Sequence, residues 1–326
     1  MKRTDGGVRA RLVRIAAVTV ALVACTEGGA RRQFLSIGTA GTGGLYYPIG
    51  GALASRLSLR DSVRTYTAEV TGGSVENIQR IASGEMDLAF VIGTTAHEAY
   101  HGGEDFATPV ASLRVVAPLY PNLTHVLVRQ GAGLETIAAL RGRRVSVGAA
   151  GSGTEQLARQ LLEAVDLSYD DVEERYLSFT ESAAALADGA IDAAILSVGF
   201  PASAVLEATT TGRIRLLPID ARVANTLSTR YPYYSQGTIP AGAYPGLERE
   251  LPTVSVMNWI VAREDLDEAV VRHVLDILAD ELPQLRQSVD IAGQIRLTNL
   301  FAAPIPLHDA AREWLERRGP GQPAAR

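Results

Sequence analysis

Two glycine-rich loops have the residue types and spacing needed to bind an anion through the backbone. The first, residues 38–50, follows an apolar run and leads into a predicted helix over residues 45–57. Glycine lets the backbone turn sharply and approach a bound group. The unpaired amides of a helix's first turn carry the positive end of its dipole. No lysine follows the loop as in a phosphate-binding loop, so we predict a small carboxylate as the bound group.

The second loop, residues 148–155, repeats the first at an offset of 110 residues and leads into a predicted helix over residues 156–165. Because two copies of one binding loop can hold a ligand from opposite sides, the repeat predicts a clamp rather than an isolated anion site. The equivalent glycines are Gly38 and Gly148, Gly41 and Gly151, and Gly43 and Gly153.

The repeat continues downstream of both loops. Each copy has a helical stretch, a glycine turn, an aspartate (Asp87 or Asp192) and an apolar strand (Leu88–Ile92 or Ala193–Val198). Such continuous apolar strands are typical of a sheet that is buried on both faces. Since the two aspartates occupy the same turn in both copies, we interpret them as structural and not as an acid–base pair.

Ten residues of these loops and the adjoining segments are candidates for contact with the ligand. For several of them a purely structural role is the alternative. Thr42 and Ser74 could cap their helices, and Ser152 could form a capping box with Glu155. Gly199 and Pro201 could simply form the turn that ends a strand. The candidates are Thr42, Gly43, Tyr46, Ser74, Asn77, Ser152, Gly153, Thr154, Gly199 and Pro201.

One enzyme motif competes with the binding-protein interpretation. His97, Glu98 and His101 satisfy H-E-x-x-H, in which two histidines one helical turn apart bind zinc beside a glutamate base. Gly102 and Gly103 end the predicted helix at once, whereas zinc chemistry of this type needs a sustained helix and a third ligand. We therefore keep a zinc-dependent hydrolase only as the alternative.

Other signatures of catalysis do not occur in the sequence. Neither loop satisfies G-x-G-x-x-G, and no G-x-S-x-G elbow is present. We predict no catalytic residue, no cofactor and no metal. The formal net charge of −5 also argues against a nucleic acid as the partner.

The first 24 residues have the features of a secretory signal peptide. Basic residues precede a short apolar run, which is too short to span a bilayer. The run ends in Leu-Val-Ala-Cys, and Cys25 is the only cysteine of the chain. This pattern resembles the bacterial lipobox, so we predict lipidation at Cys25 and an exported, membrane-tethered protein in the periplasm or at the cell surface.

The remaining chain predicts an α/β fold of two lobes around a central cleft. Residues 113–120, 125–128 and 253–261 are extended and could cross between the lobes. We predict a linker at residues 25–33, followed by lobe I at residues 34–122 plus 255–318 and lobe II at residues 123–254. A Pro- and Gly-rich tail at residues 319–326 is expected to be frayed.

The motifs in this order resemble the substrate-binding subunit of TAXI-type TRAP transporters. The resemblance rests on Thr-Gly-Gly-Leu-Tyr-Tyr-Pro-Ile-Gly at residues 42–50, Ser-Val-Glu-Asn at 74–77 and Gly-Ser-Gly-Thr-Glu at 151–155. Ile-Pro-Ala-Gly-Ala-Tyr-Pro-Gly at 239–246 and Pro-Leu-His at 306–308 follow. At residues 92–94 the chain has Ile-Gly-Thr, where the family often has a polar trio, so the ligand's identity stays open.

The resemblance implies a type II periplasmic-binding-protein fold and a small carboxylate ligand such as glutamate or 2-oxoglutarate. It also implies an integral membrane permease of the TRAP type as the partner. Proteins of this build are commonly monomers, and we expect a monomer here. A sensory binding lipoprotein of the same fold that serves no transporter is the second alternative.

Overall fold

The computed structural model describes residues 33–231 and 233–318. Contacts divide the chain into Met1–Gln33 and Phe34–Arg326, and the description below concerns the second unit. The predicted signal peptide, Cys25 and the predicted tail lie outside the described residues.

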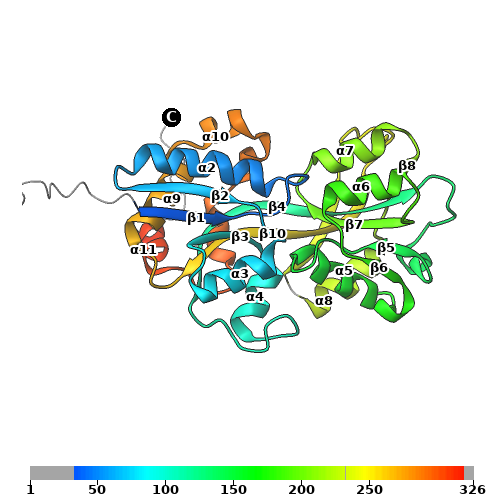
Figure 1. Ribbon diagram of the computed structural model, residues 1–326, viewed down its shortest axis with the longest axis horizontal. Coiled ribbons are helices and arrows are strands. Elements are labelled where there is room, and N and C mark those ends of the chain that lie inside the picture. Colours follow the sequence, from blue (N-terminus) through cyan, green and yellow to red (C-terminus); the bar gives the residue numbers. More distant parts are fainter. Residues whose placement is uncertain (1–32, 232, 319–326) are drawn as a thin grey trace, which may run out of the picture. The chain divides into compact units, whose positions relative to one another are not determined.

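Within these residues, ten strands form one mixed sheet with the order β2-β1-β3-β10-β4-β7-β5-β6, while β8 pairs with β4 and β9 with β10 (Figure 1). The pairs β1–β3, β5–β7 and β5–β6 are parallel, and β10 is antiparallel to β3, β4 and β9. The strands are β1 (Gln33–Gly38), β2 (Arg64–Glu69), β3 (Leu88–Ile92), β4 (Leu113–Arg129), β5 (Arg144–Ser146), β6 (Glu173–Arg175), β7 (Ala193–Val198), β8 (Ile214–Leu217), β9 (Tyr234–Ile239) and β10 (Leu251–Arg263).

Helices cover the two ends of this sheet as separate groups. Helices α2, α3, α4, α9, α10 and α11 lie around β1–β3, and we call this end lobe I. Helices α5–α8 lie around β5–β8 in lobe II (Figure 1). The α-helices are α2 (Tyr46–Arg60), α3 (Ser74–Ser83), α4 (Gly93–His101), α5 (Gly153–Glu163), α6 (Phe179–Ala187), α7 (Ser203–Thr210), α8 (Ala221–Arg230), α9 (Glu268–Asp280), α10 (Leu282–Ser288) and α11 (Asp309–Arg318). Short 3-10 helices span Ile137–Leu140, Tyr169–Asp171, Asp290–Gln294 and Leu297–Ala302.

Two long antiparallel strands connect the lobes. Strand β4 has 17 residues and β10 has 13. The first half of β4 pairs with the second half of β10, and the rest of β4 continues along β7 and β8. The extended runs predicted at residues 113–120 and 125–128 are thus parts of one strand. The exact lobe boundaries stay a prediction.

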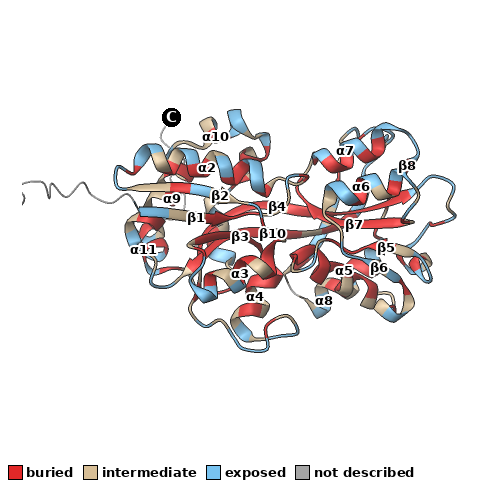
Figure 2. Cartoon of the chain, viewed as in Figure 1, coloured by how far each residue is buried: buried red, intermediate tan, exposed pale blue. Residues whose placement is uncertain are grey.

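Each lobe has its own apolar core. Lobe I is built around one large cluster that includes Phe90 and Trp259, whereas lobe II has a cluster on each face of its sheet. Strands β3 and β7 are buried along their whole length, as predicted, and form part of the buried centre of the sheet in Figure 2.

Several predicted helix boundaries need correction. Helix α2 begins at Tyr46, and Leu45 precedes it without a side-chain cap, so the structure does not support capping by Thr42, which was the alternative to its predicted ligand contact. A turn closed by the Gly44 amide and the Gly41 carbonyl delays the start of the helix. Helix α9 ends at Asp280 and α10 begins at Leu282, because Pro283 cannot donate the backbone hydrogen bond that one continuous helix would require.

Candidate functional site

The two repeated aspartates join strands within each lobe. Asp87 accepts a hydrogen bond from the Ser36 amide at 2.8 Å, and Asp192 accepts one from the Arg144 amide at 3.0 Å. Arg144 also donates to Asp192 through its guanidinium, and this pairing lowers the pKa of the carboxyl group. Both carboxylates therefore hold the strand that leads into a glycine loop, which agrees with the structural role predicted for them.

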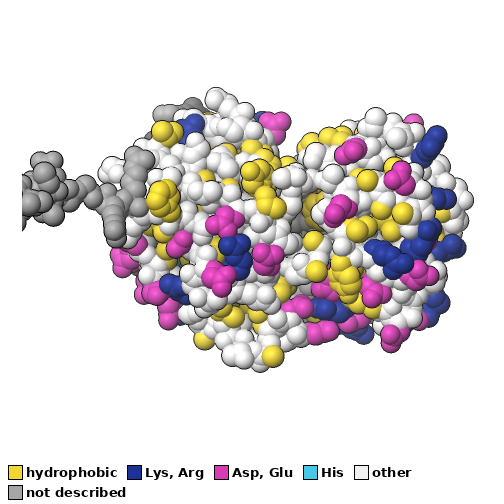
Figure 3. Space-filling model, viewed as in Figure 1, with side chains coloured by type: hydrophobic (Ala, Val, Ile, Leu, Met, Phe, Trp, Pro, Cys, Tyr) yellow, Lys and Arg dark blue, Asp and Glu magenta, His cyan; other side chains and the backbone are white. Residues whose placement is uncertain are grey.

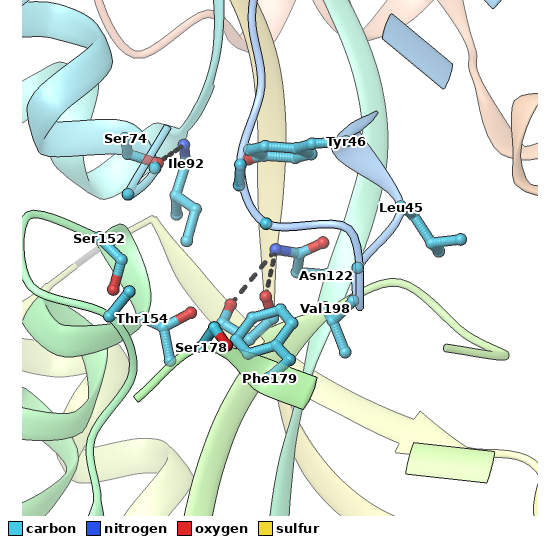
Figure 4. Close-up of a pocket in the computed structure, with 18 of the residues that line it drawn as sticks. Leu45, Tyr46, Ser74, Ile92, Asn122, Ser152, Thr154, Ser178, Phe179 and Val198 are labelled. Carbon is cyan, nitrogen blue, oxygen red and sulfur yellow. Dashed lines mark hydrogen bonds between the residues drawn. The ribbon is translucent and has the colours of Figure 1, made fainter. Parts of the chain in front are cut away.

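A cavity of about 80 Å³ lies between the glycine loops of the two lobes. Since a single water-sized probe needs roughly 10–15 Å³ of such space, the cavity accommodates a compact ligand of several non-hydrogen atoms. Figure 4 shows 18 of its residues. The cavity is lined by Ala40, Gly41, Gly44, Leu45, Tyr46, Thr71, Gly72, Gly73, Ser74, Ile92, Tyr120, Asn122, Ala149, Ser152, Gly153, Thr154, Ser178, Phe179, Ser197 and Val198.

Four helices start at this cavity. The lining includes the first residue of α2, α3, α5 and α6, so helix N-termini from both lobes face the same space. The partial positive charges of the first-turn amides favour an electronegative group there. Residues of both glycine loops thus contribute to the lining of one cavity.

The start of α5 has donors that are still available to a ligand. The Ser152 hydroxyl accepts from the Glu155 amide at 3.0 Å and caps the helix, as predicted. The other half of the predicted capping box is absent, because the Glu155 carboxylate accepts instead from the Tyr169 hydroxyl. Among the described residues, no group accepts a hydrogen bond from the amides of Gly153 or Thr154.

The start of α3 is already occupied by the opposite lobe. The Gly151 carbonyl accepts from the amides of Val75 and Glu76 at 3.1 and 3.0 Å. Ser74 is the first residue of the helix and not its cap, because its hydroxyl accepts from the Ile92 amide at 3.0 Å. The predicted capping role of Ser74 was therefore wrong, and this side chain lines the cavity instead (Figure 4).

A buried chain of hydrogen bonds connects the cavity to the crossing strands. Tyr46 donates through its hydroxyl to Asn258 of β10, and Asn258 donates to the side chain of Asn122 in β4 at 2.8 Å. Asn122 in turn donates to the Ser197 carbonyl of β7 at 2.9 Å. Burial raises the pKa of Tyr46 well above its usual value, so the hydroxyl stays protonated and can donate.

Among residues 33–231 and 233–318, no charged side chain lines the cavity. Glu76 at the start of α3 accepts from the Gly72 amide, and Glu155 pairs with Arg159 and Tyr169. Charged side chains of both signs are instead spread over the surface of both lobes on the face that Figure 3 shows. Recognition in the cavity therefore depends on amides, hydroxyl groups and the Asn122 side chain.

The structure brings half of the predicted ligand residues together at the cavity. Tyr46, Ser74, Ser152, Gly153 and Thr154 line it.

The other five candidates lie outside the lining. Thr42 and Pro201 are exposed, and the Gly43 carbonyl accepts from the Ser203 hydroxyl of lobe II at 3.2 Å. Asn77 is fully buried and donates to the carbonyls of Thr39 and Phe90. Gly199 lies against the Tyr120 ring, where an added Cβ would come within 2.9 Å of the ring edge.

Other lining residues did not appear in the sequence analysis. Ser178 could have been found, because it forms a complete capping box with Glu181 at the start of α6. Tyr120, Asn122 and Ser197 give no such local signal, because each sits in or next to an ordinary strand pattern.

The H-E-x-x-H residues lie at the end of α4. The rings of His97 and His101 are 4.4 Å apart, and His97 Nδ1 is 3.0 Å from the Tyr233 hydroxyl. The Glu98 carboxylate accepts from the Gln156 side chain and the Asp105 amide. In residues 33–231 and 233–318, no group of three His, Cys, Asp or Glu side chains is placed to hold a metal ion.

Membrane-spanning segments were also sought. Across the part of the chain that the structure describes, no helix is long and apolar enough to cross a bilayer.

Comparisons with known proteins identify relatives of this chain. The model of the NMT1-like family matches residues 37–319. The fold is similar to that of PhnD1 from Prochlorococcus marinus in complex with methylphosphonate, with a TM-score of 0.55, 14% identity, and coverage of 88% of this chain and 97% of that one. A protein from Bordetella bronchiseptica gives a TM-score of 0.54 at 17% identity, with coverage of 88% and 82%. These similarities confirm the predicted type II periplasmic-binding-protein fold.

Proposed function

Since this chain belongs to the NMT1-like family, we propose that it is an extracytoplasmic solute-binding receptor that delivers a small ligand to a membrane transporter. The observation that carries this proposal is the cavity between the lobes. The first residues of α2 and α3 from lobe I and of α5 and α6 from lobe II line it. A ligand at that place contacts both lobes and stabilises their closure.

Contacts across the cavity's rim are compatible with opening and closing. On one side the Gly43 carbonyl of lobe I accepts from Ser203 of lobe II, and on the other the Gly151 carbonyl of lobe II accepts from the start of α3. Opening would also separate the hydrogen bonds of Gln156 with Thr95 and Glu98 and the ion pair of Arg159 with Asp105, while β4 and β10 continue as the covalent connection between the lobes.

We further propose a carboxylate as the ligand and a TRAP-type permease of the TAXI class as the partner. The amides at the start of α5 support an anionic group, and the motifs at residues 42–50 and 151–155 support the transporter class. A neighbouring gene for a large multi-span TRAP permease would favour this partner. A gene for an ABC permease or no permease gene would instead favour an ABC receptor or a sensor without a transporter.

Isothermal titration calorimetry of the purified mature protein tests the receptor function. We expect at least one small carboxylate, from a panel of monocarboxylates, dicarboxylates, 2-oxo acids and amino acids, to bind at a ratio of one to one and to raise the melting temperature. The absence of binding across this panel, with a cooperative unfolding transition still present, would contradict the carboxylate receptor.

The proposed lipid anchor at Cys25 has its own test. Replacing Cys25 with serine is expected to abolish incorporation of labelled palmitate in cells, because serine lacks the thiol to which the lipid is attached. The variant should then appear in the soluble extracytoplasmic fraction. Equal palmitate incorporation in the parent and in Cys25→Ser would refute lipidation at this residue.

A further inference from the structure

We infer that the cavity selects a ligand with a single negative charge and no positive charge. This inference rests on the proposed receptor function and specifies the ligand class for the same site. It excludes amino acids and dicarboxylates as preferred ligands. Glutamate and 2-oxoglutarate, which the sequence resemblance implies, are therefore excluded as well.

The donors of the cavity are concentrated at one corner. A Cβ built on Gly153 would lie 2.9 Å from the Ser74 hydroxyl, so the start of α5 and that hydroxyl face the same small space. The Thr154 side chain is 3% exposed, and among the described residues its hydroxyl has no hydrogen-bond partner. Figure 4 shows Ser74, Ser152 and Thr154 on the same side of the cavity.

This corner provides donors for one anionic group. The Gly153 and Thr154 amides and the Thr154 hydroxyl can all donate to the oxygens of a carboxylate, with the dipole of α5 behind them. The ligand's anionic head therefore binds at the start of α5.

The opposite side of the cavity is apolar. A Cβ on Gly44 would lie 3.3 Å from the Phe179 ring and 3.7 Å from Val198 Cγ2, so these side chains converge on the first glycine loop. Leu45 lies beside them in the lining. This wall provides no charged partner for the second carboxylate of a dicarboxylate.

The surrounding charges act against a second negative charge. Glu76 and Glu181, in the first turns of α3 and α6, already accept hydrogen bonds from the Gly72 and Ser178 amides at those helix starts, whereas Glu155 in the first turn of α5 pairs with Arg159 and Tyr169. Of the residues that the structure describes, no arginine or histidine lines the cavity to offset a dianion. A dianion would therefore be desolvated in the cavity without a compensating cation.

A ligand ammonium group would also lack a partner. None of the three glutamates lines the cavity, and Glu76 and Glu155 accept hydrogen bonds from Gly72 and Tyr169. Burying an unpaired ammonium group is strongly unfavourable. An amino acid would therefore bind more weakly than the corresponding acid without the amine.

Ligands that differ in charge, with alanine and malonate matched in size to propionate, test the inference by calorimetry with the mature protein. The probes are propionate, pyruvate and lactate as monoanions, propionamide as the neutral analogue, alanine and glutamate as amino acids, and malonate and 2-oxoglutarate as dianions. We expect a monoanion to bind at least tenfold more tightly than propionamide, alanine or any dianion. If glutamate or a dianion bound more tightly than every monoanion, the inference would be overturned and the receptor function would stand. Propionamide binding as tightly as the best monoanion would have the same consequence. Binding of none of the probes by a folded protein would contradict the carboxylate receptor itself.

Variants at the polar corner locate the anionic head. Thr154→Val keeps the methyl group that packs near Gly148 and removes the hydroxyl, so we expect at least a tenfold loss of affinity for the best monoanion. Thr154→Ser should restore most of it, and Thr229→Val on the exposed face of α8 is the matched control. Gly153→Ala, whose Cβ would enter the corner, should abolish binding even if Thr154→Val folds poorly. Parental affinity in both Thr154→Val and Gly153→Ala would refute this placement of the head.

Discussion

Replacing Asn258 with alanine is expected to lower the free energy of unfolding by about 3 kcal/mol. Asn258 is fully buried in β10, accepts from the Tyr46 hydroxyl, and donates to the Tyr120 carbonyl at 2.7 Å and to Asn122. The alanine variant leaves three buried polar groups without this partner, and the desolvation of such groups is not recovered elsewhere. Urea unfolding at neutral pH measures the change.

Asn225→Ala is the matched control for this variant. Asn225 lies exposed on α8, so its replacement should change the free energy of unfolding by no more than about 0.5 kcal/mol. Ligand affinity should fall in Asn258→Ala and not in the control, because Tyr46 lines the cavity and depends on Asn258 for its orientation. A loss of stability as small as that of the control would show that the Asn258 hydrogen-bond chain contributes little.

Acidification from neutral pH to pH 4 should remove about 3 kcal/mol of stability through His125 alone. His125 is fully buried in β4, and burial lowers its pKa from 6.5 to about 4. The unfolded chain binds a proton below about pH 6.5, whereas the folded protein binds it only near pH 4. Between these values the unfolded state holds more protons, so stability is complete above the upper pH and falls as the pH decreases.

The neighbours of His125 agree with a neutral ring in the folded protein. One ring nitrogen is 3.0 Å from the Leu123 carbonyl, and the other is 2.9 Å from the Tyr244 hydroxyl. The Ala202 amide also donates to this hydroxyl. The hydroxyl can therefore donate to a neutral imidazole, whereas beside a charged imidazole its oxygen would have to accept a second hydrogen bond and its proton would lose His125 as acceptor.

His125→Asn isolates this contribution, because asparagine can still donate to the Leu123 carbonyl but does not titrate. We expect the difference in unfolding free energy between pH 7 and pH 4 to be about 3 kcal/mol smaller in this variant than in the parent. His101→Asn, at an exposed position, should keep the parental difference. An unchanged pH dependence in His125→Asn would rule out His125 as its source.

The type of fold and the repeated loops could be predicted from the sequence because their causes are local. Glycines at fixed positions allow the turns, apolar runs predict strands buried on both faces, and an aspartate three residues after a glycine recurs where it must hold a neighbouring strand. Ser152 is an example at the level of one residue, since its capping of α5 depends only on the residues that follow it.

Which side chains face the ligand was decided only by the tertiary structure. Asn77 follows Ser74 on α3 by one helical turn, yet it is buried in a hydrogen-bond network while Ser74 lines the cavity. Tyr120 and Asn122 reach the cavity because β4 passes beneath both glycine loops.

The ligand's charge could not be predicted from the sequence either, because it also depends on which side chains the tertiary structure places at the cavity. The loops indicate that an anion is bound, and this preference comes from amides that every helix start possesses. The number of charges depends on which charged side chains reach the cavity. Only the packing of the two lobes determines that, of the charged residues the structure describes, none lines the cavity.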